Sequence, residues 1–370
     1  MKIALRADSS AEMGSGHLMR CLTLADDLQQ KENEILFICR NLPGNLIDII
    51  EKKGYSVARL PYNIENRIAV DDIYLRWLGV SPQVDAAETE AIIKKEQTIF
   101  DLLVIDHYGL DRFWEEKIQP YVKKILVIDD LANRPHNCNI LLDQNFYEHP
   151  EKRYKGLIPS FCKELYGPRY SLLRPEFRKT RKYLKSRNGI IGKILVFFGG
   201  SDLSNETNKV LYAIKLLNNS FITFDIVVGF SNPHKEHIRR ECQNIPNTRF
   251  FCQIENMAQL MAEADLAVGA GGTTTWERCF LGLPSIVEII AKNQEETTNA
   301  VGRLGAIWNL GWYANVSITD IAKAIEMMLV NPALLKEISN KAFQLMDDNV
   351  NIDNNFVLSL LDGGKNDKQN

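Results

Sequence analysis

The sequence lacks several features that mark specialised protein classes. No apolar run approaches the ~18 residues that a membrane-spanning helix needs. The opening segment, MKIALRADSS, has too short an apolar stretch for a signal peptide, because Arg6 and Asp8 follow it directly. The net charge is only −3, from 44 basic and 47 acidic residues, which gives no electrostatic case for nucleic acid or an anionic membrane. We therefore expect neither nucleic-acid nor membrane partners.

Cysteine pairs are also missing. Seven cysteines lie scattered between Cys21 and Cys279 without a CxxC motif, which predicts reduced, mostly buried thiols in a cytoplasmic protein. The apolar share of 45% and the charged share of 25% are ordinary for globular proteins and exclude a disordered or collagen-like chain. At ~150 residues per domain, 370 residues predict about two domains.

The sequence does contain an alternation of apolar strands and amphipathic helices, and this pattern occurs twice, once in each half of the chain. In the first half we expect strands at 2–7, 34–39, 101–106, 124–129 and 140–143, with helices at 17–30, 86–99 and 111–123. In the second half we expect strands at 193–198, 224–228, 248–252, 265–268 and 285–289, and helices from about Asn205 and at 234–243, 256–263, 274–281 and 294–303. Two last helices within 318–348 are separated at Asn331-Pro332.

This alternation predicts an α/β protein with two Rossmann-like domains, whose parallel sheets face each other across a cleft. We expect a first domain at 1–175, a linker at 176–192, a second domain at 193–348 and a C-terminal tail at 349–370. The basic run 174–191 is typical of a solvated linker helix. A nucleic-acid patch is disfavoured there, because no aromatic platform accompanies the run.

The first expected strand leads into a turn that ends in Gly14-Ser15-Gly16-His17. Both glycines would allow positive φ and a close backbone approach to a ligand. His17 would open a helix, where the dipole favours an anion and the neutral imidazole, which suits a general base. The alternative is a histidine bonded to its own loop. The turn lacks the third glycine of the GxGxxG dinucleotide fingerprint.

Polar residues follow the other strands of the first half: Asp106-His107-Tyr108, Asp129-Asp130 and Asp143-Gln144-Asn145. A single carboxylate at a strand end is more often a helix N-cap than a ligand group. Asp129, Asp130 and Asp143 could together hold a metal ion, which we regard as the weaker hypothesis because no histidine or cysteine anchor accompanies them.

The densest motif of the second half is Gly269-Ala270-Gly271-Gly272 followed by Thr273, Thr274 and Thr275. A glycine loop that leads into a threonine-rich helix start can cradle a pyrophosphate. Glu277, one turn on, could accept the hydroxyls of a ribose, or could simply complement the helix dipole. The turn Gly199–Asp202 is a second anion-facing loop. No Walker motif is present, which disfavours an ATPase.

Taken together, these motifs resemble the PseG family, the UDP-sugar hydrolases of pseudaminic acid biosynthesis. The similarity is carried by RADSSAEMGSGHLMRCLTLA (6–25), DHYGLDRFWE (106–115), VIDDLANRPHNCNILLDQN (127–145), YGPRYSLLRPEF (166–177), VFFGGSD (196–202), GAGGTTTWERC (269–279) and KNQEE (292–296). It extends to about residue 345. More distantly, the layout is similar to MurG-like glycosyltransferases of the two-domain GT-B architecture.

The resemblance implies hydrolysis of UDP-2,4-diacetamido-2,4,6-trideoxy-β-L-altropyranose to UDP and the free sugar, without a metal or another cofactor, in a pathway that serves flagellin glycosylation. It implies that His17 is the catalytic base. The candidate substrate-binding residues are Gly14, Ser15, Gly16, Tyr108, Arg174, Gly271, Gly272, Thr273, Thr274, Glu277 and Asn293.

Three alternatives stay open at this point. A GT-B glycosyltransferase would use the same UDP cradle with a sugar or lipid acceptor in place of water, and fold alone does not choose between them. A UDP-sugar 2-epimerase would leave the sugar attached to UDP. A sensor would bind UDP without turnover. The residues indicate no oligomeric state.

Overall fold

The computed structural model describes residues 1–29, 33–63, 71–184, 186–350 and 357, and these form two compact units. Of the described residues before 351, unit 1 contains 1–145 and 149–172, and unit 2 contains 146–148 and 173–350. The C-terminal tail that we expect from residue 349 lies almost entirely outside the described residues.

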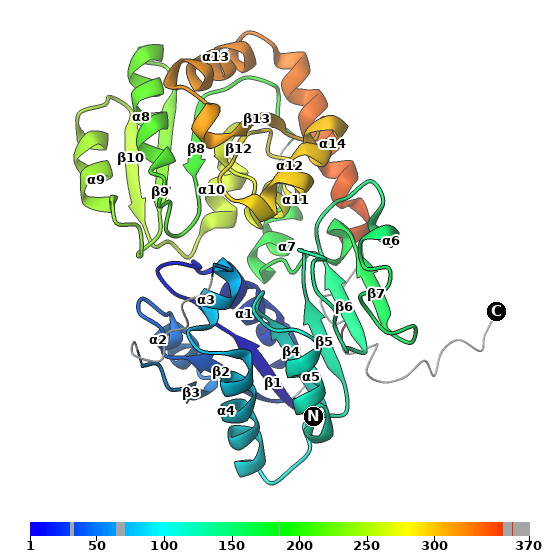
Figure 1. Ribbon diagram of the computed structural model, residues 1–370. Helices are drawn as coiled ribbons and strands as arrows, with labels where there is room; N and C mark the ends of the chain where they lie inside the picture. Colours follow the sequence, from blue (N-terminus) through cyan, green and yellow to red (C-terminus); the bar gives the residue numbers. More distant parts are fainter. Residues whose placement is uncertain (30–32, 64–70, 185, 351–356, 358–370) are drawn as a thin grey trace, which may run out of the picture. The chain divides into compact units, whose positions relative to one another are not determined.

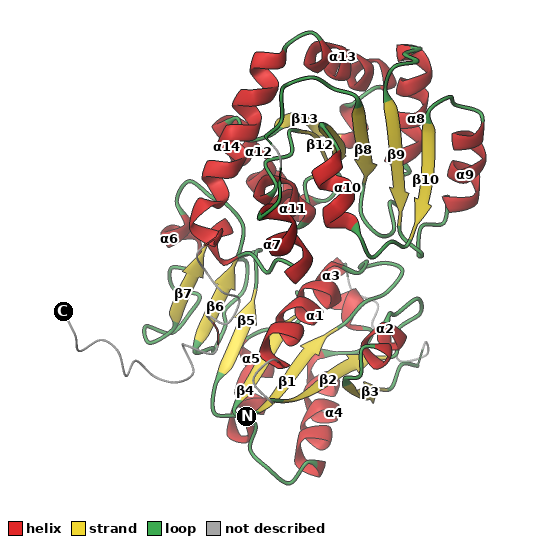
Figure 2. Cartoon of the chain, turned by 180° about the vertical axis from the view of Figure 1, so that it is seen from behind, coloured by secondary structure: helices red, strands yellow, loops and turns green. Residues whose placement is uncertain are grey.

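Unit 1 is built on one parallel sheet with the strand order β3-β2-β1-β4-β5-β6-β7 (Figures 1 and 2). Its strands are β1 (Lys2–Ala7), β2 (Glu34–Arg40), β3 (Ser56–Leu60), β4 (Leu102–Asp106), β5 (Ile125–Ile128), β6 (Ile140–Asp143) and β7 (Lys163–Tyr166). Its helices are α1 (Gly16–Gln29), α2 (Ile47–Lys52), α3 (Ile73–Leu78), α4 (Pro82–Lys95), α5 (Arg112–Ile118) and α6 (Pro150–Arg153).

Helices cover both faces of this sheet, which explains why its central strands are mostly apolar. On one face, Leu18 and Leu22 of α1 pack with Ile50 of α2 against the strands. On the other face, Ile93 of α4 and Trp114 of α5 pack against alternate strand residues. The sheet is therefore the centre of two hydrophobic cores.

A buried ionic network fixes α4 to the sheet. Asp85 of α4 accepts hydrogen bonds from Arg6 of β1 at 2.6 Å and from Arg40 of β2 at 2.7 Å. Asp8 completes the network through an ion pair with Arg6 at 2.7 Å. The side chains of these four residues are fully buried, so each charge depends on its partner for stabilisation.

Unit 2 also contains one parallel sheet, with the order β10-β9-β8-β11-β12-β13 (Figure 1). Its strands are β8 (Lys193–Phe197), β9 (Thr223–Val228), β10 (Thr248–Cys252), β11 (Leu266–Ala270), β12 (Ser285–Ile289) and β13 (Trp308–Trp312). Its helices are α7 (Pro175–Arg181), α8 (Glu206–Leu217), α9 (Lys235–Gln243), α10 (Met257–Glu263), α11 (Thr274–Phe280), α12 (Glu295–Leu304), α13 (Ile318–Leu329) and α14 (Pro332–Val350).

The helices of unit 2 again divide between the two faces of the sheet. Val210 of α8, Ile238 of α9 and Ile325 of α13 pack in one core. Met261 of α10 and Trp276 of α11 belong to the core on the other face. The predicted break between the last two helices is confirmed, because α13 ends at Leu329 and α14 begins at Pro332.

The segment that we expect to be a solvated linker helix is instead packed onto unit 2. Phe177 of α7 is fully buried in a core of that unit. Further along, the Arg187 guanidinium donates to the carbonyl oxygens of Ala264, Leu281 and Met261 at 2.6–3.1 Å. The basic charges predicted a solvated surface, but the apolar Phe177 and the carbonyl partners of Arg187 outweigh that pattern.

The predicted burial of the thiols is confirmed, because every cysteine except the partly exposed Cys252 is buried. Within the described ranges, no helix is both long and apolar enough to cross a membrane.

Candidate functional site

The strand orders place a crossover point in each unit, where ligands of doubly wound sheets bind. In unit 1 the chain reverses direction across the sheet between β1 and β4, and in unit 2 between β8 and β11. The residues after β1 and β4 therefore lie at one edge of the first sheet, and those after β8 and β11 at one edge of the second.

The turn after β1 closes on itself before α1 begins. Ser10 and Gly14 exchange two backbone hydrogen bonds of 2.9 and 3.3 Å, and the Ser15 carbonyl accepts the amide of Met19. Gly14 has a φ of +78°, which favours glycine. The expectation of positive φ at Gly16 is wrong, because Gly16 is already the first residue of α1.

His17 lies within hydrogen-bond distance of a carboxylate from the neighbouring crossover strand. Its Nδ1 is 2.6 Å from Oδ1 of Asp106, the last residue of β4. Arg20, one turn along α1, donates to both oxygens of Asp106 at 2.5 and 2.7 Å. An Nδ1–H that donates to Asp106 leaves Nε2 as the basic nitrogen of His17.

Arg20 and His17 stabilise the negative charge of Asp106. Burial would raise the pKa of the Asp106 carboxyl, but Arg20 and His17 overcome this effect and hold the pKa well below its usual range. Asp106 is therefore an anion throughout the neutral pH range, and it can stabilise a protonated His17.

Tyr108 and Asp130 extend the site along the same edge. The Tyr108 hydroxyl donates to Asp130, and the side-chain amide of Asn145 donates to the same carboxylate at 3.2 Å. Burial and the nearby Asp130 charge raise the pKa of Tyr108 well above its usual value, so its hydroxyl keeps its proton. The Tyr108 ring contacts the His17 ring edge to face, with centroids 4.4 Å apart.

The remaining strand-end carboxylates neither cap helices nor gather around a metal position. Asp129 pairs with Arg134 at 2.8 Å, and Asp143 accepts from the Tyr154 hydroxyl at 3.1 Å. Burial and the Asp130 charge raise the pKa of Asp143 well above its usual range. Over the described ranges, no group of three or more His, Cys, Asp or Glu residues is arranged to hold a metal ion. The N-cap expectation is wrong for these positions, and Asp111 caps α5 instead.

In unit 2, the end of β11 and the loop that follows it need glycine for steric reasons. A Cβ at Gly269 would lie 2.3 Å from the carbonyl oxygen of Phe197. A Cβ at Gly271 would lie 2.1 Å from Oγ1 of Thr298, in the first part of α12. β11 can therefore lie this close to β8 only with glycine at 269, and the loop can pass this close to α12 only with glycine at 271. It leads into α11, with Thr273 exposed and Thr274 half-buried.

A buried cation, Arg278, lies beneath this loop. Its guanidinium donates to the carbonyl oxygen of Ala270 at 2.8 Å and to the Thr275 hydroxyl at 3.0 Å. Burial lowers the pKa of Arg278 to about 10, so it stays positive near neutral pH. The nearby Glu277 carboxylate opposes this lowering of the pKa. The predicted anion cradle thus has a buried positive charge beneath it.

The structure also brings together two of the predicted substrate-binding residues, Arg174 and Glu277. Arg174 donates to Oε1 of Glu277 through Nε at 3.1 Å and Nη2 at 3.0 Å. Oε2 of Glu277 makes no hydrogen bond within the described part of the chain. Asn293 lies in a 3-10 turn, Lys292–Gln294, directly before α12. Its neighbour Gln294 reaches to within 3.5 Å of a Cβ built on Gly272, so this turn adjoins the glycine loop.

The second predicted anion loop is already occupied by a carboxylate of the chain. Asp202 accepts the backbone amides of Glu206 and Thr207 at 2.9 and 3.0 Å. These amides begin α8 and are therefore not available to a ligand anion. Burial raises the pKa of Asp202.

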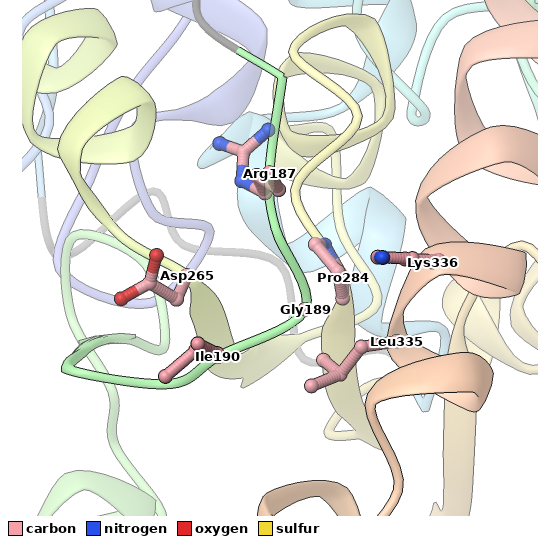
Figure 3. Close-up of a pocket in the computed structure, with 7 residues that line it drawn as sticks. All are labelled: Arg187, Gly189, Ile190, Asp265, Pro284, Leu335 and Lys336. Carbon is pink, nitrogen blue, oxygen red and sulfur yellow. The ribbon is translucent and has the colours of Figure 1, made fainter.

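A small crevice occurs at the opposite end of the second sheet (Figure 3). It has a volume of about 10 Å³, enough for about one water molecule. Arg187, Asp265 and Pro284 line it, and they precede or flank the amino ends of the strands. The crevice lies away from the glycine loop and is too small for a substrate.

Comparisons with known proteins show which family and which fold this chain is similar to. The model of the glycosyltransferase family 28 C-terminal domain matches residues 194–350. The chain is 30% identical to the UDP-2,4-diacetamido-2,4,6-trideoxy-β-L-altropyranose hydrolase of Campylobacter jejuni, over 82% of this chain and 97% of that protein. It is 24% identical to the spore coat polysaccharide biosynthesis protein SpsG of Bacillus subtilis, with 84% of each chain covered.

An uncharacterised protein of Methanocaldococcus jannaschii, MJ1062, is 30% identical over 78% of this chain, which spans only 55% of that protein's length. Among solved structures, MurG of Acinetobacter baumannii superposes with a TM-score of 0.63 at 14% identity, covering 98% of this chain and 99% of that one. LpCGTa in complex with UDP gives a TM-score of 0.61 at 13% identity, covering 93% of each chain. These structural matches show the GT-B fold.

Proposed function

The chain belongs to the family of the UDP-2,4-diacetamido-2,4,6-trideoxy-β-L-altropyranose hydrolase, and from this premise we propose that it hydrolyses this UDP-sugar to UDP and the free sugar. The observation that carries the proposal is the His17–Asp106 pair at the crossover point of unit 1. A histidine oriented by a buried carboxylate is an arrangement that activates water as a nucleophile.

In the proposed reaction, Nε2 of His17 takes a proton from a water molecule that attacks the anomeric carbon. The bond between that carbon and the β-phosphate oxygen breaks, and UDP leaves with the bonding electrons. The imidazolium that forms is stabilised by the ionised Asp106, which Arg20 holds in place. The transition state has oxocarbenium character, as in inverting glycoside hydrolysis.

We assign UDP binding to unit 2. The amides that begin α11 and the Gly271–Thr274 loop would hold the pyrophosphate, and Arg278 would supply a positive charge from below. Arg174 takes up Oε1 of Glu277, so Oε2 is the oxygen that would accept ribose hydroxyls. Asn293 adjoins this loop and would contact the substrate from the next turn. The uracil would lie against the loop Gln253–Met257.

In this scheme the backbone amides that begin α11 and the Arg278 guanidinium stabilise the negative charge that develops on UDP. UDP is already a good leaving group, so the scheme requires neither a general acid nor a metal ion. Arg174 is paired with Glu277 and also with Glu176 at 3.1 Å, and therefore serves to orient Glu277 rather than to neutralise phosphate.

The decisive test is release of UDP from the diacetamido-trideoxy UDP-sugar with no acceptor present. His17→Asn should lower kcat by ~10²–10⁴-fold and leave UDP affinity unchanged, because the base is removed while the cradle of unit 2 is intact. His149→Asn is the matched control, since His149 is exposed in the same unit. Wild-type kcat in His17→Asn would refute the base assignment.

The stereochemical outcome is tested separately by NMR of the newly released sugar. Direct attack by water from the face opposite UDP should give the α anomer first. First appearance of the β anomer would contradict the inverting route.

A glycosyltransferase is the second candidate, because the family 28 C-terminal domain and the MurG-like fold are shared with such enzymes. It would place an acceptor hydroxyl where the hydrolase places water, with His17 as the base in both cases. UDP release that requires an added sugar or lipid acceptor would favour this candidate over hydrolysis.

A further inference from the structure

Two aromatic side chains stand beside His17 that the proposed chemistry does not use. Tyr74 and Trp77 lie on α3, and the Trp77 ring centroid is 6.4 Å from that of His17. Both rings also contact Tyr108, at 5.1 Å from Tyr74 and 6.1 Å from Trp77. We call Tyr74, Trp77 and Tyr108 the aromatic wall. The helix that supplies its first two members lies beside α1 in both Figures 1 and 2.

Short as it is, α3 is held firmly enough to present these rings. Asp72 caps its start by accepting the amides of Tyr74 and Leu75. It ends at Gly79, which has a φ of +78°. A Cβ at Gly79 would lie 3.0 Å from the Leu42 side chain, so the end of α3 packs closely onto unit 1.

The wall is not a part of the hydrophobic core. α3 directs Leu78 into the core, where that side chain is fully buried. Tyr74 and Trp77 are outside both core clusters of unit 1 and stay half-buried, although Tyr108 is only 5% exposed. Residues spaced i and i+3 on a helix share a face, so both rings lie on the side of α3 that contacts Tyr108. Partly open aromatic surface next to a reactive histidine is a binding surface rather than packing.

From this geometry we propose, on the basis of the function proposed above, that the aromatic wall is the subsite for the methyl-bearing groups of the sugar. Water attacks at the anomeric carbon beside His17, so the remaining ring atoms and their substituents must lie near that side chain. Aromatic faces bury C–H and methyl groups favourably and gain nothing from hydroxyls. The wall therefore selects deoxy and N-acylated sugars over fully hydroxylated hexoses.

The test measures binding rather than turnover, in a His17→Asn background that should consume the ligand ~10²–10⁴-fold more slowly. Calorimetry compares UDP-2,4-diacetamido-2,4,6-trideoxy-β-L-altropyranose, UDP-glucose and UDP. The background should bind the diacetamido sugar more tightly than UDP-glucose. Adding Trp77→Ala should lower that preference by about tenfold, the lower end of what one apolar contact contributes to selectivity. UDP affinity should not change, since unit 2 binds UDP.

The more conservative Trp77→Phe keeps an aromatic ring and should retain more of the preference, which separates loss of the surface from loss of folding. Phe161→Ala is the matched control, because Phe161 is an exposed aromatic next to the amino end of β7. An unchanged preference in Trp77→Ala, an equal loss for all three ligands, or equal affinity of the background for both sugars would each overturn the proposal. Discrimination in binding without UDP release by the wild-type chain would instead refute the hydrolase function and leave the wall supported.

Discussion

His17 Nδ1 lies 2.6 Å from Asp106 Oδ1, although 89 positions separate the two residues in the chain. The parallel pairing of β1 with β4 brings the two residues together, because His17 follows β1 and Asp106 is the last residue of β4. The carboxylate fixes both the tautomer and the orientation of the imidazole, which is the role of the third group in hydrolytic triads. In the proposed mechanism, Asp106 is thus a positioning residue that acts through His17.

Replacing Asp106 by Asn should therefore lower kcat for UDP release by ~10²–10⁴-fold. The amide can donate to Nδ1, which favours the tautomer with Nε2 protonated and removes the base. The measurement is kcat as a function of pH. A change in the pH profile together with unchanged UDP affinity supports a positioning role, whereas a uniform loss that parallels a fall in Tm would show that Asp106 only stabilises the fold.

The central strands of both sheets could be predicted because they are mostly apolar. The strands that the sequence pattern missed are β3 (Ser56–Leu60), β7 (Lys163–Tyr166) and β13 (Trp308–Trp312), and each lies at an edge of its sheet. Their residues are mostly half-buried or exposed, so they lack the apolar run that marks a central strand. The short helices α2 and α3 were not predicted for a related reason, since six residues are too few to show the hydrophobic periodicity of a helix.

The candidate site could be predicted where its signal is local. The turn Gly14–His17 and the loop Gly271–Thr274 are contiguous motifs, and both lie at crossover edges. The contacts of Asp106 and Arg20 with His17 could not be predicted, because they depend on which strands are neighbours in the sheet. The i, i+3 spacing of His17 and Arg20 on α1 was the one available signal. Arg278 was missed because its burial beneath the loop is not visible in the pattern.

Arg278 should contribute to UDP affinity through its charge. Arg278→Met should weaken UDP binding by ~10–100-fold, in keeping with ~1.5–3 kcal/mol for an interaction with a charged group. Uridine carries no phosphate, so its affinity should stay nearly constant. Arg278→Lys restores a positive charge and should recover part of the loss. Equal losses for UDP and uridine would show that Arg278 maintains the shape of the loop and not its electrostatics.

The stability of unit 2 should fall as pH rises through the titration of Glu288. This side chain is fully buried in β12, next to Glu206 and with Lys209 Nζ 3.5 Å away. Burial and the Glu206 charge, opposed by Lys209, raise the pKa of Glu288 from 4.5 to about 8. Between these values the folded state holds a proton that the unfolded state has lost, so the free energy of unfolding decreases from pH 4.5 to about 8 and levels off above.

Tm measured across this range should therefore decline less in Glu288→Gln than in the wild type, because Gln is neutral at every pH. Glu236→Gln is the control, since Glu236 is exposed in the same unit and should leave the slope unchanged. Parallel Tm curves for wild type and Glu288→Gln would refute the assignment of the decline to Glu288.

The glycine loop should show strong coupling between Gly271 and Thr298. A Cβ at Gly271 would overlap Oγ1 of Thr298 at 2.1 Å, so Gly271→Ala must push α12 away or distort the loop. Overpacking of this kind costs ~1–3 kcal/mol. Thr298→Ala removes the clashing oxygen, so the double variant should recover most of the stability that Gly271→Ala loses. Gly272→Ala is the matched control, because its Cβ would meet only Gln294 at an ordinary 3.5 Å. Urea denaturation of the four chains gives the coupling energy, and strictly additive losses would show that the clash relaxes elsewhere.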